Sequence, residues 1–350
     1  MSANYHFNTY HTATRFHIAR ELKRQGWERS DNSQALFSEK NLSLDAEVSK
    51  QFEYKHLLAD LLQNAKVDFF PLTYSVNDQN YEQVLSQIML RHHLIDNVYQ
   101  SKVKGLKWIL KPATLNNGDE IKLFDNIDAL KKHFKSSSRL GGDHVIQRYI
   151  NNPALYNGRK FTYRVCSAFT NFAGIYLYKQ GYANISAFPY QTDDGFENRR
   201  IHITNYVLDG VLSGIEQKLA DQLPNFDSIY ADMLRIVKQC ALLLIARYPA
   251  YLQPSDINVI EFFGFDFVLD TNGKLWLLEI NQTPDCPIDE EHEFMLSLWY
   301  PYWESVVDNF VLPAALKVAA KNREQHFTEV LDESSCYSKW KALLSRLKIL

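Results

Sequence analysis

The chain has 350 residues, of which 46% are hydrophobic, and its formal net charge at pH 7 is -3. This length fits two domains or one large multi-lobed domain with a sizeable core, and the near-neutral charge gives no sign of a nucleic-acid partner. The N-terminus shows no signal-peptide pattern, and no apolar run approaches the ~20 residues of a membrane span, so no membrane partner is expected.

The cysteines indicate a reducing compartment. They are far apart in the sequence and form neither a metal-binding pair nor a disulfide framework. They are Cys166, Cys240, Cys286 and Cys336. We therefore interpret all four as ordinary thiols and expect a cytoplasmic location.

Hydrophobic periodicity predicts mainly helices in the first 150 residues. The predicted helices cover residues 14–25, 52–65, 81–94 and 127–134. Two short strands are predicted at residues 108–112 and 145–150, and the first of them ends at a proline. A polar loop at residues 116–119 follows this first strand.

Aromatic and β-branched residues indicate a β-rich region from residue 160 onward. The predicted strands cover residues 161–169 and 174–178, and the predicted helices cover residues 226–247 and 294–320. The apolar stripe of the first helix is expected to pack in the core. The second helix contains Pro301 and Pro313 and should be segmented. The charged tail from residue 321 is expected to end in a docked amphipathic helix at residues 340–350.

A hairpin with polar insertions is predicted between the last two of these helices. Two apolar runs, 262–269 and 275–280, flank a polar linker that contains Asn-Gly. Asp266, Glu279 and Asn281 are set into this hairpin, and strand alternation places the last two on one face. Buried carboxylates need compensation, and Mg²⁺ binds carboxylate, amide and phosphate oxygens, so the pattern predicts a metal site. The alternative is a surface hairpin whose polar residues face solvent.

Basic residues precede these carboxylates along the chain. Lys111 comes first, Lys160 and Arg164 follow, and the acidic hairpin comes last. This order suits a nucleoside triphosphate with Mg²⁺, because cations hold phosphate oxygens and carboxylates hold the bridging metal. The sequence lacks a P-loop, a Gly-x-Gly-x-x-Gly fingerprint and the motifs of protein kinases, which excludes these nucleotide-binding classes.

Five blocks in this order resemble the tubulin tyrosine ligase-like family, a branch of the ATP-grasp ligases. They are Trp108-Ile109-Leu110-Lys111-Pro112, Val145-Ile146-Gln147-Arg148-Tyr149-Ile150, Arg159-Lys160-Phe161 with Arg164, His202-Ile203-Thr204-Asn205, and the Phe-Gly-Phe-Asp-Phe and Leu-Glu-Ile-Asn pieces of the hairpin. Each block alone is weak, whereas the ordered set is specific and covers roughly half of the chain. Lys55, followed by Phe70-Pro71 and Tyr74, resembles more weakly the family's linker before the central lobe.

The resemblance implies an α+β ATP-grasp fold. An N-terminal lobe would cover residues 1–105, a central lobe residues 106–158, a C-terminal lobe residues 159–320 and the tail residues 321–350. The nucleotide would lie between the central and C-terminal lobes, as ligands often do at lobe junctions.

The resemblance also implies the site residues and the cofactors, ATP and Mg²⁺. The ATP-binding residues would be Lys111 and Lys160 at the phosphates, and Gln147, Tyr149 and Ile150 at the adenine. The Mg²⁺ ligands would be Asp266, Glu279 and Asn281. Arg164 and Asn205 would be catalytic, near the γ-phosphate and the reacting carboxylate.

The implied reaction joins an amino acid to a carboxylate of a protein or peptide. ATP first phosphorylates the carboxylate, because a carboxylate oxygen is a poor leaving group, and the amine then displaces phosphate from the acyl phosphate. One alternative is a nucleotide-binding pseudoenzyme that serves as an interaction module. Another is an ATP-grasp ligase that acts on a small metabolite.

The sequence departs from the family pattern at four positions. Thr162 stands where the family has aspartate, Asn184 where it has a second arginine, Asn117 where lysine is usual, and Glu120 where glycine is usual. Lys122 is close enough in sequence to replace the loop lysine. The phosphate and metal positions are retained, but the position of Asn184 lies on the substrate side in the family, so the amino acid stays open. The N-terminal part is shorter than in tubulin-modifying members, so tubulin itself is not implied.

Overall fold

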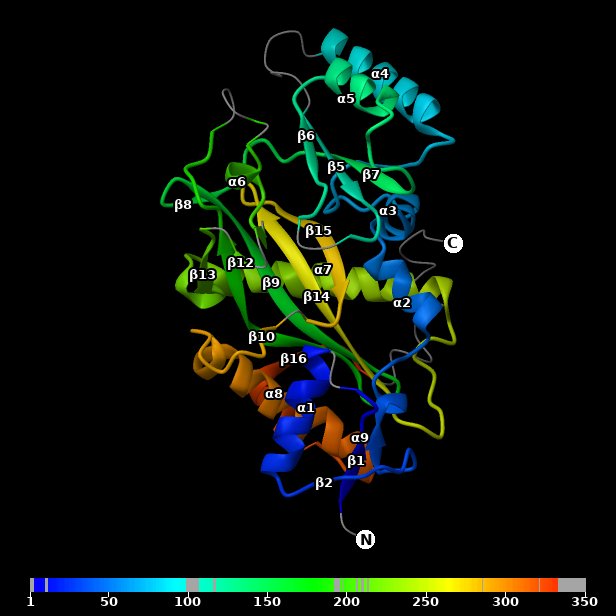
Figure 1. Cartoon of the computed structure of the whole chain (residues 1–350), viewed down its shortest axis with the longest axis vertical. Coiled ribbons are helices and arrows are strands. Elements are labelled where there is room, and N and C mark those ends of the chain that lie inside the picture. The colour runs from blue at the N-terminus through cyan, green and yellow to red at the C-terminus, as the bar shows by residue number, and fades with distance from the viewer. Residues whose placement is uncertain are drawn as a thin grey trace.

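The computed structural model describes residues 3–9, 12–98, 107–115, 118–191, 196, 198–205, 207–208, 211–212, 214–284, 286–320 and 322–332. Within these residues the strands form four sheets, accompanied by helices. The largest sheet lies in the middle of the molecule, between α4 (Tyr81–Val98) and α5 (Ile127–Lys135) at one end and α1 (Ala13–Arg24) and α8 (Tyr300–Val306) at the other (Figure 1). This mixed architecture agrees with the predicted α+β class, and the division into lobes stays a prediction.

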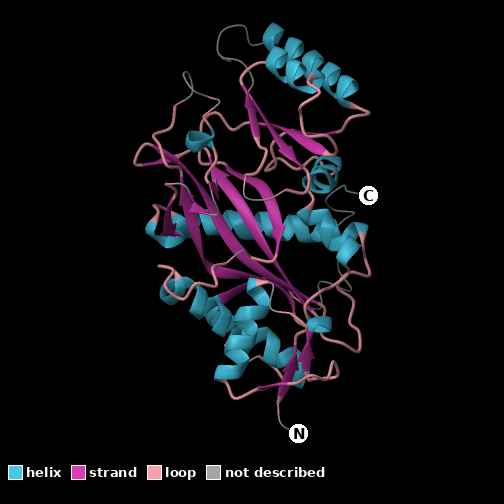
Figure 2. Cartoon of the chain, in the orientation of Figure 1, coloured by secondary structure: helices cyan, strands magenta, loops and turns pink. Residues whose placement is uncertain are grey.

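The largest sheet has seven antiparallel strands in the order β13-β10-β9-β14-β15, with β16 also paired to β10 and β8 to β9. The strands are β8 (Leu155–Tyr156), β9 (Arg159–Thr170), β10 (Gly174–Ile185), β13 (Glu216–Leu219), β14 (Ile260–Leu269), β15 (Leu275–Gln282) and β16 (Phe327–Leu331). Figure 2 shows the long helix α7 (Phe226–Arg247) lying across one face of this sheet.

Both faces of the seven-stranded sheet are covered, which explains the nearly continuous apolar sequence of its central strands. Phe263 packs in the core formed with α7, whereas the preceding Phe262 packs in the core formed with α8. Val165 and Ala168 on β9 divide between the same two cores. A strand that is buried on both faces cannot show the apolar–polar alternation of a half-exposed strand.

The hairpin of β14 and β15 matches the prediction from the sequence. Its turn contains Gly273 at φ 78°, a conformation that glycine adopts without strain. The Asp270 carboxylate accepts hydrogen bonds from the backbone N–H groups of Asn272 at 2.9 Å and Lys274 at 3.0 Å. The Asp-to-Gly linker therefore fixes the turn by local hydrogen bonds, and the turn fixes the register of the two strands.

A four-stranded antiparallel sheet faces the end of the larger one. Its order is β4-β7-β5-β6, with β4 at Thr73–Val76, β5 at Trp108–Pro112, β6 at Lys122–Phe124 and β7 at His144–Arg148. Trp108 and Leu110 pack against α4 and α5, whereas Ile109 and Lys111 line a pocket on the opposite face. Strand alternation thus sends one row of β5 into the core and the other toward the larger sheet.

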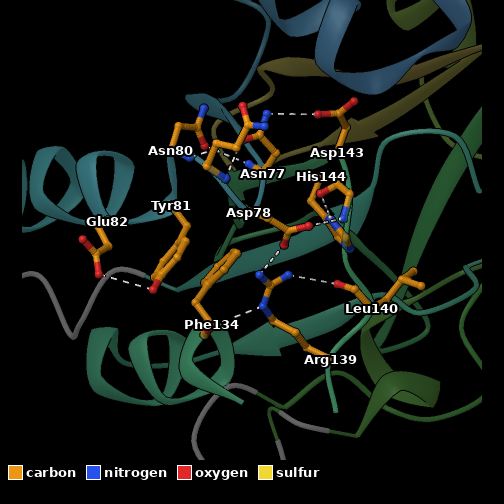
Figure 3. Close-up of polar contacts among 12 residues, drawn as sticks. Asn77, Asp78, Asn80, Tyr81, Glu82, Phe134, Arg139, Leu140, Asp143 and His144 are labelled. Atoms are coloured by element: carbon orange, nitrogen blue, oxygen red, sulfur yellow. Dashed lines mark hydrogen bonds and ion pairs between the residues drawn. The ribbon is translucent and has the colours of Figure 1, made fainter. Parts of the chain in front are cut away.

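Polar contacts hold the turn before α4 against the loop after α5 (Figure 3). The Asp78 carboxylate pairs with the Arg139 guanidinium and accepts the backbone N–H of Gly142 at 2.9 Å. Arg139 also lies over the ring of Phe134 and donates to the backbone oxygen of Leu140 at 3.2 Å. These contacts connect the turn that follows β4 to the loop that precedes β7.

The remaining elements lie around the two sheets. A parallel three-stranded sheet comprises β1 (Asn4–His6), β2 (Glu28–Arg29) and β3 (Phe37–Ser38). The short elements are η1 (Glu39–Asn41), α6 (Arg199–His202), β11 (Val207–Leu208), β12 (Val211–Leu212), η2 (Ala220–Gln222) and α10 (Arg323–His326). The helix α3 (Lys55–Asn64) contacts both β7 and β15, so it joins the smaller sheet to the larger one.

The predicted helix with two prolines forms one continuous helical path of four segments. They are η3 (Met295–Trp299), α8 (Tyr300–Val306), η4 (Val307–Val311) and α9 (Leu312–Leu316), and the two η segments are π-helical. Pro301 and Pro313 each lie at the start of an α segment, directly after a π segment. Proline cannot donate the usual backbone hydrogen bond, and the wider π turn before it accommodates that loss.

One prediction needs correction. The predicted helix 52–65 is two helices, α2 (Ala46–Glu53) and α3, because Tyr54 between them is extended, with ψ 117°. The backbone N–H of Lys55 bonds to Ala113 O at 3.0 Å instead of to the preceding turn. The predicted tail contributes β16, which pairs with β10. The helix predicted at 340–350 lies outside the described residues, and the domain boundaries at 105, 158 and 320 stay predictions.

Candidate active site

A pocket lies between the four-stranded and seven-stranded sheets. Its volume is about 620 Å³, including its open mouth. It is lined by residues of both sheets, of α3, of the loop between β5 and β6, and of α6 with the segment after it: Lys55, Ile109, Lys111, Leu115, Gly118, Ile121, Lys160, Thr162, Asn184, His202, Ile203, Thr204, Asn205, Asp266, Leu278 and Glu279. The pocket therefore collects residues from four of the five sequence blocks, and Gln147 of the fifth lies behind it.

Lys111 and Gln147 form one wall through adjacent strands. Lys111 on β5 is 6% exposed, and its Nζ donates to Gln147 Oε1 at 3.0 Å. Gln147 Nε2 in turn donates to Thr73 Oγ1 at 3.1 Å. Burial lowers the pKa of Lys111, with a smaller opposing effect from Glu279. Gln147 therefore orients the lysine from behind.

Lys160 lies on the opposite wall, at the start of β9. Its Nζ donates to His202 O at 2.8 Å and to the Tyr149 hydroxyl at 3.2 Å. Burial and the nearby charge of Lys111 lower the pKa of Lys160 to about 7. Burial and the charge of Lys160 likewise lower the pKa of His202 to about 3, so this imidazole is neutral at pH 7. Among the described residues, Lys160 is held in place by neutral acceptors and by no carboxylate.

Arg164 and Asp266 form a partly buried two-pronged ion pair across β9 and β14. Arg164 Nε and Nη2 bond to the two carboxylate oxygens of Asp266, the second at 2.6 Å. Gly264 makes this geometry possible, since a Cβ there would lie 3.0 Å from Arg164 Cδ. The glycine in Phe-Gly-Phe-Asp-Phe thus gives the guanidinium room to lie flat across the strand.

A β-bulge aims Glu279 into the pocket. Asp266 pairs with Glu279 in the β14–β15 register, but the next residue, Phe267, pairs with Leu277. The extra residue, Leu278, lets Leu278 and Glu279 both line the pocket. Asn281 also points to this face, because its Nδ2 donates to Asp266 Oδ2 at 3.3 Å. The predicted common face of Glu279 and Asn281 is confirmed.

Lys55 completes the charge arrangement at the start of α3. Its Nζ lies 3.8 Å from Glu279 Oε2 and donates to Leu115 O at 2.8 Å. Burial raises the pKa of Glu279, but the charges of Lys55, Lys111 and Arg164 outweigh burial and lower this pKa overall. Among the described residues, three basic groups thus surround two carboxylates and Lys160 also lines the pocket, which leaves excess positive charge for an anionic ligand.

The residues around Asp266 suit a hard divalent cation. Within the described residues, no cluster of three or more His, Cys, Asp or Glu side chains could hold a metal ion. Two adjacent carboxylates and one amide do, however, match a Mg²⁺ ion that takes its other ligands from phosphate and water. Asp266 keeps free lone pairs while it accepts from Arg164, and the adjacent carboxylates would repel each other less with a cation between them.

Neutral pairs occupy two positions where the family has charges. Thr162 Oγ1 lies 2.6 Å from Thr204 Oγ1, and Asn184 Oδ1 accepts from Gln217 Nε2 at 2.8 Å. Asn205 lines the pocket beside Gly118, where a Cβ would lie 3.5 Å from Asn205 Oδ1. The loop after β5 therefore contacts the segment that carries the predicted catalytic asparagine.

Several other predicted residues do not line the pocket. Tyr149 and Ile150 follow the end of β7 and do not line the pocket, although Tyr149 supports Lys160 from behind. Lys122 lies 3.7 Å from Glu120 at the surface, and Asn117 lies outside the described residues. The sequence reasoning left Lys55 and His202 out of the site. Lys55 had a weak signal in its spacing before Phe70-Pro71, whereas the role of His202 depends on a backbone oxygen, which no side-chain pattern reveals.

Known proteins are similar to this chain in sequence. The model of the tubulin-tyrosine ligase family matches residues 46–315. Tubulin glycylase 3B of Tetrahymena thermophila is 27% identical over 55% of this chain and 17% of its own length. Tubulin polyglutamylase TTLL5 of Homo sapiens is 28% identical over 67% of this chain and 21% of its own length. Probable tubulin polyglutamylase ttll-9 of Caenorhabditis elegans is 25% identical over 59% of this chain and 52% of its own length. The matched part of this chain thus spans about half or less of each relative.

Proposed function

Because the chain belongs to the tubulin-tyrosine ligase family, we propose that it is an ATP- and Mg²⁺-dependent ligase that joins an amino acid to a carboxylate of a protein or peptide. The observation that carries the proposal is the pocket lined by Lys55, Lys111, Lys160, Asp266 and Glu279, with Arg164 paired to Asp266. A magnesium nucleotide is anionic overall and would satisfy both the excess cations and the adjacent carboxylates.

Each part of the pocket has a separate task in this proposal. Lys55, Lys111 and Lys160 hold phosphate oxygens, and Asp266, Glu279 and Asn281 would hold Mg²⁺, which neutralises charge on the transferred phosphoryl group. Arg164 and Asn205 would act on the reacting carboxylate and the γ-phosphate. The adenine would lie toward the end of β7, near Gln147, Tyr149 and the main chain of Ile150.

The reaction follows from the poor leaving ability of a carboxylate oxygen. The acceptor carboxylate attacks the γ-phosphorus and ADP leaves, and the neutral amine then attacks the acyl carbon and phosphate leaves. The amine loses one proton as the amide bond forms. Buried cations stabilise the negative charge that develops in both steps. Tubulin peptides are the first acceptors to test, because the relatives are named as tubulin-modifying enzymes.

The first test measures the thermal midpoint with and without Mg²⁺ and ATP. A ligand that binds only the folded chain raises the midpoint by mass action. We expect a metal-dependent rise in the wild-type chain and in the control Glu291→Gln, whose side chain is exposed. Glu279→Gln should lose the metal dependence. No rise in the wild-type chain at millimolar ATP would overturn the nucleotide site.

A nucleotide-binding interaction module is the second candidate function. It is favoured by Thr162, since the aspartate of the family pattern is replaced by a threonine whose hydroxyl is already bonded to Thr204. ATP binding without ADP release, across panels of amines and of protein, peptide and small-molecule carboxylates, would establish this candidate. ADP release that depends on a small carboxylate alone would instead indicate a metabolite ligase.

A further inference from the structure

Arg164 and Asp266 are bound to each other, although the proposed function gives them different partners. Asp266 would hold Mg²⁺, and Arg164 would act on the reacting carboxylate and the γ-phosphate. In the structure, Arg164 Nε and Nη2 bond instead to the two oxygens of the Asp266 carboxylate. Among the described residues that line the pocket, Asp266 is present and Arg164 is not. Arg164 must therefore leave Asp266 before it can meet a ligand in the pocket.

Most lone pairs of the Asp266 carboxylate are already used. A carboxylate offers about four lone-pair positions to hydrogen-bond donors or metal ions. Arg164 takes two of these positions, and Asn281 Nδ2 donates to Oδ2 at 3.3 Å. A metal ion on the remaining position would share one carboxylate with a guanidinium, and two positive charges at such a short distance repel each other. Mg²⁺ therefore competes with Arg164 for Asp266.

The strands of the large sheet build this ion pair. Arg164 on β9 and Asp266 on β14 are partners in the strand register. Gly264 leaves room for the guanidinium, since a Cβ there would lie 3.0 Å from Arg164 Cδ and 3.3 Å from Arg164 Nη1. The two side chains are only 12% and 13% exposed, so water replaces a lost partner poorly.

Separation of the pair leaves each charge with little compensation. Asp266 lies in register with Glu279, so without Arg164 it would face a second carboxylate. A metal ion between the two carboxylates would replace the positive charge that Asp266 loses. An anionic group would replace the negative charge that Arg164 loses. Each ligand thus compensates one member of the separated pair.

We propose that the Arg164–Asp266 pair is a lock on the metal site, which Mg²⁺ opens by displacing the guanidinium from Asp266. The displaced Arg164 then binds the reacting carboxylate. The inference rests on the proposed ligase function and specifies how its ligands bind. Because each ligand compensates one member of the separated pair, metal and carboxylate bind cooperatively, and each tightens binding of the other by the same factor.

The first test measures Mn²⁺ binding by electron paramagnetic resonance without nucleotide, because Mn²⁺ accepts the same oxygen ligands as Mg²⁺. Arg164→Lys keeps the charge, but one ammonium group cannot reproduce the two-pronged contact with Asp266. This variant should bind Mn²⁺ about tenfold more tightly than the wild-type chain, as expected for the loss of one charged hydrogen bond from the competitor. Arg164→Met removes the competitor and should tighten Mn²⁺ binding further.

Arg159→Lys is the matched control. It makes the same change earlier on β9, where Arg159 pairs with Glu216 and neither residue lines the pocket. Its Mn²⁺ affinity should equal that of the wild-type chain. Because Arg164→Lys leaves the net charge unchanged, tighter binding in that variant cannot come from charge alone. Unchanged or weaker Mn²⁺ binding in Arg164→Lys, or an equal gain in Arg159→Lys, would overturn the lock.

The second test measures whether metal and carboxylate bind cooperatively. Acetate is the probe, since it carries the carboxylate of an acceptor and little else. At constant ionic strength, acetate should tighten Mn²⁺ binding to the wild-type chain by about fivefold or more, the lower end of typical coupling between two ligands. It should have no such effect on Arg164→Met. Equal effects on the two chains, or none on the wild-type chain, would overturn the release of Arg164 to a carboxylate.

These measurements separate failure of the lock from failure of the ligase proposal. If Mg²⁺ with ATP raises the thermal midpoint of the wild-type chain but Arg164→Lys binds Mn²⁺ no more tightly, the nucleotide site stands and the lock fails. If no variant binds Mn²⁺ and Mg²⁺ with ATP gives no rise, both fail. Tighter Mn²⁺ binding in Arg164→Lys supports the lock even where no amino acid or acceptor supports ADP release.

Discussion

The site contains a charged group and a neutral group of side chains. In the charged group, Lys55, Lys111 and Arg164 surround Asp266 and Glu279, and each charge has an opposite charge nearby. In the neutral group, Thr162, Asn184 and Thr204 bond to neutral partners. The charged group retains the residues of the family pattern, whereas Thr162 and Asn184 of the neutral group are two of the four departures. Substitutions in each group can therefore test whether nucleotide binding depends on the charged group alone.

The largest effect is expected in the charged group, from Glu279→Gln. The substitution removes a negative charge with little change in volume and leaves Asp266 as the sole carboxylate of the predicted Mg²⁺ ligands. Turnover with Mg²⁺ should fall by about a hundredfold or more, since charge compensation of the phosphoryl group is lost. Turnover at the wild-type rate, measured as ADP release, would show that the metal assignment is wrong.

Lys160→Met should have the next largest effect. Its effect on the free energy of unfolding depends on pH. The pKa of Lys160 is about 7 in the folded chain and about 10.4 in an unfolded one. The unfolded state therefore binds more protons between these values, so this lysine's contribution to the free energy of unfolding rises with pH across that window. Without nucleotide, the wild-type chain should gain about 2 kcal/mol relative to Lys160→Met between about pH 7 and pH 9.

Urea unfolding at several pH values measures this difference. The control Lys238→Met alters an exposed lysine on α7 and should show no such trend. In the same samples, Lys160→Met should weaken ATP binding by about ten- to a hundredfold, because one charged hydrogen bond to phosphate is lost. Parallel stability curves for the wild-type chain and Lys160→Met would contradict the buried position of this lysine.

Gly264→Ala should have an intermediate effect by disturbing the ion pair of Arg164 and Asp266. The added methyl group would lie 3.0 Å from Arg164 Cδ, so the arginine or the strand must shift, at a cost of about 1–3 kcal/mol in the free energy of unfolding. Urea unfolding of a double-mutant cycle with Arg164→Ala checks the cause. The alanine should cost clearly less without the arginine, and equal costs would point to the backbone of β14 instead.

Thr162→Val, a substitution in the neutral group, should have the smallest effect. It keeps the shape of the side chain and leaves the Thr204 hydroxyl without its partner, which should cost about 1 kcal/mol in the free energy of unfolding. ATP affinity, measured by calorimetry, should stay unchanged, and Thr162→Ser should restore the lost stability. A drop in ATP affinity as large as that of Lys160→Met would mean that the neutral group also contributes to ATP binding.

Local patterns predicted most of the fold. The two apolar runs 262–269 and 275–280, the proline at the end of β5 and the stripe of α7 are local patterns, and the structure has these elements as predicted. Short edge strands such as β13 and β16 were missed, because their pairing partner, β10, is far away in sequence. The break at Tyr54 was missed for the same reason, since Ala113 supplies the acceptor.

The site was predicted in composition and less well in geometry. The order of motifs named Lys111, Lys160, Asp266 and Glu279, which all line the pocket. It did not predict that Arg164 would pair with Asp266, because this contact crosses between strands and requires the space above Gly264. It also could not show that Asn184 is bonded to Gln217, since β13 carries no motif.

The pairing of β16 with β10 bears on how the chain should be shortened. Residues 175–178 of β10 bond to β16, whereas residues 182–185 bond to β13. A chain cut at residue 315, where the family match ends, would lose β16 and leave the first half of β10 as an open strand edge. Open edges pair with other chains. Such a fragment should keep its pocket residues and yet self-associate, so studies of the isolated family region are best carried out with residues 316–332 retained.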